Sequence, residues 1–184
     1  MPALLFARVN LDLIYPRFLA VALDVVARCN ARGFVYVATH GTRTIAEQNA
    51  LHAKWKMGVG GKAAPGGSSA HNYGCAFDFC RDASDLAGLQ ADWRQAAYNV
   101  LGEETRAAGL VWGGSFGDAP HINFPGVTTA KDMSPLLHLY MAQAGSATDA
   151  QRLGVVWSFL EKQVRTERFE RANPRLFARM AALP

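Results

Sequence analysis

Two short segments of this 184-residue chain carry the residue types that hydrolytic metal sites use. The first segment contains His71 and Asp78, and the second contains Asp118 and His121. A catalytic zinc ion needs three protein ligands, an open position for water and a nearby general base. If the two segments meet in space, they supply the side chains of a metallohydrolase. Spacing alone leaves the alternative open, because a histidine in a chain of this kind is more often structural than a metal ligand.

The residues around these segments predict an α+β fold. We expect a small central antiparallel sheet that carries the metal site, flanked by helices, with a helical C-terminal region. The catalytic core is expected over residues 1–126, with residues 127–184 as a helical extension packed on the same domain. The predicted elements are, in chain order, a helix over 16–33, a strand over 34–39, a helix over 44–57, a glycine-rich loop over 58–70, a strand over 74–80, a helix over 92–108, and strands over 110–112 and 121–124.

Asp78 is the residue that most needs an explanation within this pattern. It shares a strand face with Ala76 and Cys80, so its carboxylate is surrounded by apolar neighbours. Burying a carboxylate is costly unless it is paired or bound to a metal. His71 lies in the loop before this strand and His121 at the start of another strand, so both can reach a point beside the sheet.

Composition narrows the function classes without choosing one. The net charge of +4 and the pI of about 9.1 suit an anionic partner, but no sequence motif supports a nucleic-acid binder. Cys29, Cys75 and Cys80 are expected to be free buried thiols. We find no secretory signal and no apolar stretch long enough for membrane insertion, so the chain is expected to remain in the cytoplasm after synthesis.

The chain resembles the peptidase M15 family of zinc peptidases, whose signature is filled at every position by Ser69-x-His71-x-x-Gly74-x-Ala76-x-Asp78. The family includes D,D-carboxypeptidases, D-Ala-D-Ala dipeptidases, and phage and bacterial L-alanyl-D-glutamate endopeptidases. The resemblance is strong over residues 8–124, and the run 71–74 looks like the endopeptidase branch. It also rests on Arg8 to Asp12 with Tyr15-Pro16, on Gly41-Thr42-Arg43-Thr44 with Glu47-Gln48, and on residues 109–114 followed by Asp118-x-Pro120-His121.

The resemblance implies a role for each residue of the predicted site. It implies that His71, Asp78 and His121 bind Zn²⁺, and that Asp118 is the base that deprotonates the attacking water. A carboxylate in that position takes a proton from the water and passes it to the leaving amine.

The resemblance further implies that Arg43 holds the substrate or stabilises the oxyanion, and that Ser69 and Asn72 contact the substrate. The alternative makes Arg43 a surface helix residue and Ser69 a turn residue. The chain departs from the family pattern at three positions that we expect to line the substrate cleft, namely Thr42, Ile122 and Asn123.

The predicted function is a zinc-dependent endopeptidase that cuts the L-Ala–D-Glu bond of peptidoglycan stem peptides. By resemblance it is a phage or prophage endolysin, monomeric, made in the host bacterial cytoplasm and reaching the cell wall through a holin-type pore. One alternative is a D,D-carboxypeptidase or D-Ala-D-Ala dipeptidase of the same family. Another is a catalytically silent module that binds the cell wall, although the intact set of site residues argues against it.

Overall fold

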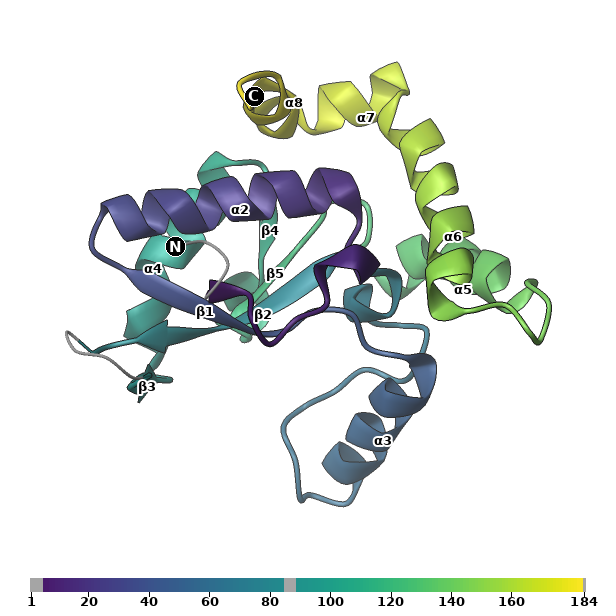
Figure 1. Cartoon of the computed structure of the whole chain (residues 1–184), viewed down its shortest axis with the longest axis horizontal. Helices are drawn as coiled ribbons and strands as arrows, with labels where there is room; N and C mark the ends of the chain where they lie inside the picture. Colours follow the sequence, from purple (N-terminus) through teal and green to yellow (C-terminus); the bar gives the residue numbers. More distant parts are fainter. Residues whose placement is uncertain (1–4, 85–88, 184) are drawn as a thin grey trace.

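The computed structural model describes residues 5–84 and 89–183, and it confirms the expected α+β class. An antiparallel sheet forms the centre, and helices pack around it (Figure 1). The strands are β1 (Val35–His40), β2 (Ala76–Asp82), β3 (Ala91–Asp92), β4 (Val111–Trp112) and β5 (His121–Asn123).

Strand β2 is the centre of the sheet. Strand β1 pairs with one of its edges, while β5 pairs with the first half of the other edge and β3 with the second half. Strand β4 completes the order β1-β2-β5-β4. In this register Asp78 lies opposite His121, so strand pairing alone places two of the predicted ligands side by side.

Helix α2 (Pro16–Ala31) covers one face of the sheet (Figure 1). Pro16 suits the first helical position, where a backbone N–H has no intrahelical partner. The apolar side of the helix is buried, and the Phe18 ring stacks on Phe77 of β2 with centroids 5.3 Å apart. The helix therefore fills the side of β2 opposite to the face that carries Asp78.

Gly74 forms the sharp turn that delivers His71 to the start of β2. It ends the 3₁₀ turn η2 (Ala70–Tyr73) in the left-handed conformation, with φ of 65°. A β-carbon at Gly74 would lie 2.2 Å from the Leu13 carbonyl oxygen, which no real contact allows. Both the conformation and the close approach therefore require glycine at this position.

The predicted helix over 92–108 is wrong in its first part. Strand β3 includes Asp92, η3 (Gln95–Tyr98) follows, and α4 (Asn99–Ala107) begins only after it. The Asp92 carboxylate accepts hydrogen bonds from the Arg94 backbone N–H and guanidinium. Such local side-chain bonding gives the backbone an alternative to the helix.

Helix α3 (Ile45–Lys56) begins at the expected capping box, in which Thr44 and Glu47 each bond the other's backbone N–H. It lies away from the sheet, next to the loop that leads to η2 (Figure 1). Gln48 of α3, residues 61–64 of the loop and Asp78 of β2 line one cleft.

The C-terminal third is helical, as expected. Its helices are α5 (Ala130–Met141), α6 (Asp149–Val164), α7 (Glu167–Ala172) and α8 (Pro174–Ala181). Trp157 of α6 donates a hydrogen bond from Nε1 to the Tyr73 carbonyl at 2.9 Å, and Glu161 accepts hydrogen bonds from Tyr15 and Arg17. The first contact ties α6 to the turn that carries His71, and the others tie it to the start of α2. The division at residues 126 and 127 stays a prediction.

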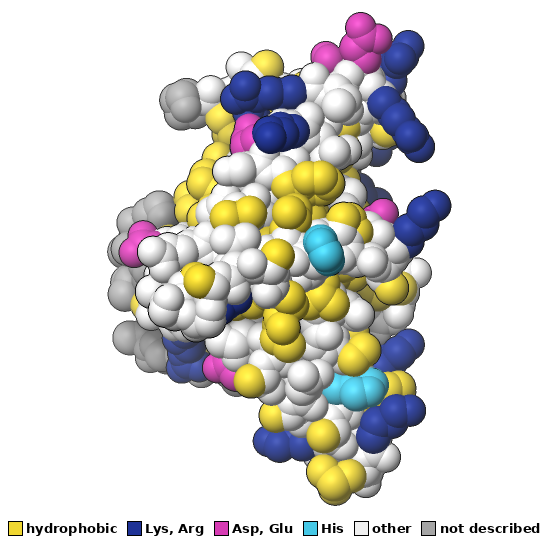
Figure 2. Space-filling view, turned by 90° about the vertical axis from the view of Figure 1, so that its right-hand side faces the viewer, with side chains coloured by type: hydrophobic (Ala, Val, Ile, Leu, Met, Phe, Trp, Pro, Cys, Tyr) yellow, Lys and Arg dark blue, Asp and Glu magenta, His cyan; other side chains and the backbone are white. Residues whose placement is uncertain are grey.

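Figure 2 shows how charged and hydrophobic side chains lie on one face of the molecule. Lysine and arginine side chains lie mostly around the edge of this face, and hydrophobic side chains gather in its middle. The three cysteines are buried free thiols. Among the described residues, no helix has both the length and the apolar character that a membrane span requires.

Candidate metal centre

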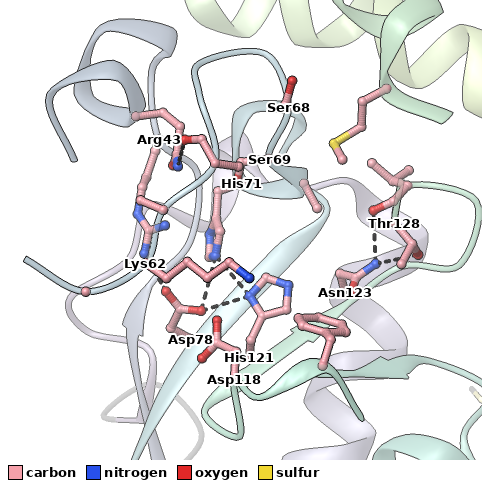
Figure 3. A pocket seen from close by; sticks show the side chains of 18 of the residues that line it. Arg43, Lys62, Ser68, Ser69, His71, Asp78, Asp118, His121, Asn123 and Thr128 are labelled. Carbon is pink, nitrogen blue, oxygen red and sulfur yellow. Dashed lines mark hydrogen bonds and ion pairs between the residues drawn. The ribbon is translucent and has the colours of Figure 1, made fainter. Parts of the chain in front are cut away.

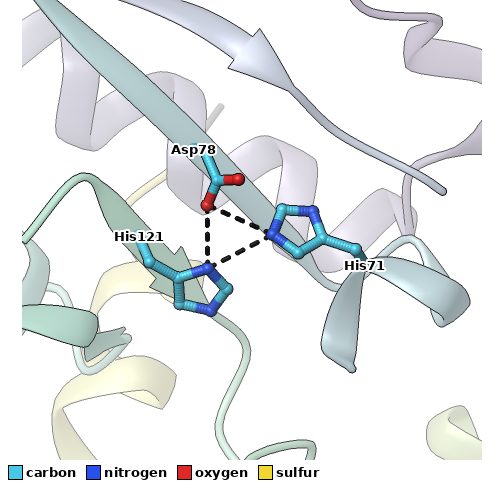
Figure 4. Close-up of side chains that lie close together, drawn as sticks. All are labelled: His71, Asp78 and His121. Atoms are coloured by element: carbon cyan, nitrogen blue, oxygen red, sulfur yellow. Dashed lines mark hydrogen bonds and ion pairs between the residues drawn. The ribbon is translucent and has the colours of Figure 1, made fainter. Parts of the chain in front are cut away.

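Three predicted ligands meet at one point beside the sheet (Figure 4). His71 Nε2 lies 3.2 Å from Asp78 Oδ1 and 3.2 Å from His121 Nδ1, and His121 Nδ1 lies 3.0 Å from Asp78 Oδ1. The three residues come from η2, β2 and β5, so the turn at Gly74 and the pairing of the two strands together create the cluster.

His71 is held in the tautomer that a metal ligand needs. Its Nδ1 donates a hydrogen bond to the Gly41 carbonyl oxygen at 2.6 Å, which leaves the Nε2 lone pair directed at the cluster. The ring is buried, and this burial lowers the pKa of His71 despite the opposing charge of Asp78. A neutral imidazole in a fixed orientation is the form that binds zinc.

Asp78 is held from both sides. Burial alone would raise the pKa of its carboxyl, but His71 and His121 lower that pKa well below its ordinary value. The Arg43 guanidinium bonds Oδ2 through Nη2, so Oδ1 is the oxygen that faces the two imidazoles. Arg43 therefore orients Asp78, a role that its position in the sequence does not reveal, while its contact with an oxyanion stays a prediction.

The donor set fits a zinc ion. Two imidazole nitrogens and one carboxylate oxygen are ligands that zinc commonly takes. Ligand atoms about 2 Å from a tetrahedral zinc lie roughly 3.3 Å apart, close to the separations found here. Three electron-pair donors this close together also require a cation or shared protons between them. The cluster can therefore hold a metal without rearrangement.

Asp118 lies beside the cluster on the turn that precedes β5. Its carboxylate points toward the space in front of Asp78 and His121 (Figure 3). The cleft walls partly desolvate this carboxyl and raise its pKa, Asp78 acts in the same direction, and His121 and His71 oppose them. Gly113 fixes the turn, because its carbonyl accepts the Asp118 backbone N–H at 2.9 Å.

An open cleft of about 450 Å³ contains the cluster. Arg43, Ser69 and Asp118 line it together with the three ligands, and Ser69 makes no side-chain hydrogen bond with any described residue. The structure thus brings six of the seven predicted site residues to one cleft.

Asn72 is the predicted site residue that does not line this cleft. Its side chain is buried, donates to the Arg43 and Thr44 carbonyls, and accepts the Gly67 backbone N–H at 2.8 Å. These bonds join the loop before η2 to the segment before α3. A contact between Asn72 and substrate stays a prediction.

The three departures from the family pattern occupy different environments. Asn123 lines the cleft, but its amide nitrogen is used by the carbonyls of Phe124 and Val127 and by the Thr128 hydroxyl. Ile122 is fully buried on the other face of β5, and the Thr42 hydroxyl bonds the Leu13 carbonyl in a separate pocket. The expectation that all three line the cleft is therefore wrong for Thr42 and Ile122.

Two cleft residues are not apparent from the sequence. Lys62 lies in the glycine-rich loop, and Phe116, which is 54% exposed, lies in the turn before Asp118 with its ring 5.9 Å from the His121 ring. Neither residue belongs to a motif. The only sequence signal for them is that they lie in loops next to the motifs.

The part of the chain that matches known proteins contains the residues of the metal cluster. A family model described as D-alanyl-D-alanine carboxypeptidase, of the peptidase M15 group, matches residues 62–124, which contain all three ligands and Asp118. The chain is 32% identical over 102 residues to the peptidoglycan L-alanyl-D-glutamate endopeptidase CwlK of Bacillus subtilis (strain 168). That alignment covers 50% of this chain and 61% of the relative, so the chain matches less than two thirds of the relative's length.

A solved structure, the Serratia marcescens L-Ala D-Glu endopeptidase ChiX, is 22% identical with a TM-score of 0.45. The match covers 62% of this chain and 83% of that one. The family signature, the matched segment and the relative agree, and the cluster of ligands lies inside the matched residues. Residues 62–124 of this chain therefore match a peptidase M15 family model, and they contain the whole candidate metal cluster.

Proposed function

We propose that this chain is a zinc-dependent peptidoglycan endopeptidase that cleaves the L-Ala–D-Glu bond of stem peptides. The observation that carries the proposal is the meeting of His71, Asp78 and His121 in one open cleft with Asp118 beside them. The choice of bond is supported by the printed activity of the Bacillus relative and by the endopeptidase-like run at residues 71–74.

The proposed chemistry divides between the metal and the side chains. Zinc bound by these ligands would supply a Lewis acid that polarises the scissile carbonyl and activates a water molecule. Asp118 accepts the proton of the attacking water and delivers it to the leaving amine nitrogen. Arg43 keeps Asp78 oriented through Oδ2, and the Ser69 hydroxyl offers a hydrogen bond to the peptide.

A second candidate is a D,D-carboxypeptidase, which the description of the matching family model favours. Both reactions use the same ligands and base, and they differ in which residue leaves. The identity of the product therefore decides between them.

The experiment is digestion of purified peptidoglycan, with identification of the newly freed groups by amine labelling and mass spectrometry. A new D-Glu amine supports the endopeptidase, and free D-Ala supports the carboxypeptidase. Release must stop with a chelator and return with zinc. If no chelator-sensitive product forms, both candidates are wrong.

We also propose that the enzyme acts in lysis of a bacterial host, as a phage or prophage endolysin. The support is the similarity of the segments at residues 8–12 and 15–16 to phage-type members of the family. In this proposal the protein accumulates in the host cytoplasm and gains access to the wall through a holin-type pore. Expression in bacteria tests it: lysis should require a co-expressed holin, and lysis without one contradicts the proposed route.

A further inference from the structure

Lys62 extends into the cleft from the wall formed by the glycine-rich loop. It follows Gly60 and Gly61, lines the cleft, and its side chain points toward the His71–Asp78–His121 group (Figure 3). The residue is exposed, and its ammonium has no ion-pair partner among residues 5–84 and 89–183. Lys62 is thus a free positive charge directed at the reaction site.

Arg43, the other cation of the cleft, is already engaged. Its guanidinium pairs with Asp78, and its side chain is only 17% exposed. The remaining polar side chains of this cleft region, such as Ser68 and Ser69, are neutral or belong to the metal cluster and its base. An anionic group of a bound substrate would therefore find its counter-charge at Lys62.

The proposed substrate has an anionic group close to the bond that breaks. In the L-Ala–D-Glu link, the D-Glu nitrogen leaves, and the carbon bonded to that nitrogen carries a free α-carboxylate. The carboxylate carbon is two bonds from the nitrogen, so it lies within about 3 Å of it. A lysine side chain at the rim of the cleft can reach such a group while its stem stays flexible.

We propose that Lys62 binds the α-carboxylate of the D-Glu residue and makes the enzyme prefer stem peptides with a free acid over peptides with an α-amide. This proposal rests on the endopeptidase activity proposed above. A charge-assisted hydrogen bond is stronger than a neutral one, so the ammonium discriminates between a carboxylate and the neutral amide of isoglutamine. Lys62 is in this view a specificity-determining residue rather than part of the proton transfer.

The experiment compares two synthetic stem peptides that differ only in D-Glu or D-isoglutamine at the second position. The assay uses four proteins, namely wild type, Lys62→Met, Lys62→Arg and the control Lys131→Met. The control removes one exposed positive charge from α5, outside the cleft. We expect wild type and the control to cleave the free-acid peptide about tenfold faster in kcat/KM, the factor that one charged hydrogen bond provides. Lys62→Met should lose this preference by slowing only the free-acid peptide, and Lys62→Arg should keep it.

Binding gives a readout that does not depend on turnover. The Asp118→Asn protein binds the peptides without cleaving them. Adding Lys62→Met to this protein should raise the dissociation constant of the free-acid peptide about tenfold and leave that of the amide peptide unchanged. Equal cleavage of both peptides by wild type overturns the proposal, as does an equal loss on both peptides in Lys62→Met. Cleavage of neither peptide by wild type contradicts the endopeptidase function itself, which is a different result from cleavage without preference.

Discussion

The guanidinium of Arg43 holds Oδ2 of Asp78, which leaves Oδ1 facing His71 Nε2 and His121 Nδ1. One carboxylate thus connects a residue from the segment before α3 with ligands from η2 and β5. The orientation of the Asp78 ligand oxygen depends on a side chain that does not itself bind the metal.

Replacing Arg43 by Ala should therefore weaken zinc binding. Partners that orient a metal ligand typically contribute 10–100-fold in affinity, and we expect a loss of about that size. Competition with a chromogenic chelator measures it. Arg94→Ala is the matched control, because Arg94 pairs with Asp92 at the surface, away from the cleft. An unchanged zinc affinity in Arg43→Ala would show that Asp78 is oriented without it.

Replacing Asp118 by Asn should stop turnover and leave the metal in place. The substitution keeps the shape of the side chain and removes its basicity, and loss of a general base typically lowers kcat by about 10²–10⁴-fold. Asp118 is outside the three-ligand group, so one zinc per chain should remain by elemental analysis. If the metal is lost along with activity, Asp118 is a ligand and its assignment as the base is wrong.

Replacing Gly113 by Ala should disturb the turn that carries both Asp118 and His121. The new β-carbon would lie 2.3 Å from the Asp118 carbonyl oxygen and 2.7 Å from His121 Cβ. Overpacking of this kind costs about 1–3 kcal/mol in unfolding free energy, and zinc affinity should fall with it.

Gly154→Ala is the control for that substitution, because nothing lies within 4 Å of its added β-carbon in α6. It should be neutral or stabilise the protein by up to about 1 kcal/mol. Urea unfolding and zinc titration of both variants measure the contrast. Equal stability of the two variants would show that the turn relaxes freely.

Glu161 should make stability depend on acid pH. Its hydrogen bond with Arg17 lowers the pKa of the carboxyl below its ordinary value of 4.5, with burial opposing and the Tyr15 hydroxyl adding to the lowering. The folded state therefore holds the proton less readily than the unfolded state, so this contribution is present above pH 4.5 and is lost as pH falls through the folded pKa. Because the pair is about one third exposed, the contribution is about 1 kcal/mol or less.

Glu161→Gln tests this by urea unfolding at a series of pH values. The difference in unfolding free energy between wild type and variant should be largest near neutral pH and shrink below pH 4.5. A difference that stays constant across this range would mean that the charge of Glu161 does not contribute.

Much of the fold and the metal ligands could be predicted from local pattern. Periodicity and caps identified α2 and α3, and the isolated carboxylate of Asp78 on an apolar strand pointed to a ligand. The register that places Asp78 opposite His121 could not be predicted from spacing, because it depends on pairing between distant strands. The family resemblance supplied that link.

The differences between the sequence-based predictions and the structure have separate physical causes. The sequence pattern places Asp92 in a helix, because the bonds between Asp92 and Arg94 leave no periodic signal. Comparison with the family pattern predicts Ile122 in the cleft, although strand alternation directs its side chain to the face opposite His121. Lys62 cannot be predicted from the sequence, because a loop lysine carries no pattern that distinguishes a cleft residue from a solvated one.

We propose that one zinc ion at the His71–Asp78–His121 cluster supports peptide hydrolysis. The most direct test is a titration of metal-free protein with zinc, in which bound zinc per chain and cleavage of a stem peptide are followed together. We predict that activity rises in proportion to bound zinc and stops rising at one equivalent, and that Asp78→Ala shows neither binding nor activity. Cleavage that persists in the metal-free protein, or full activity in Asp78→Ala, would contradict it.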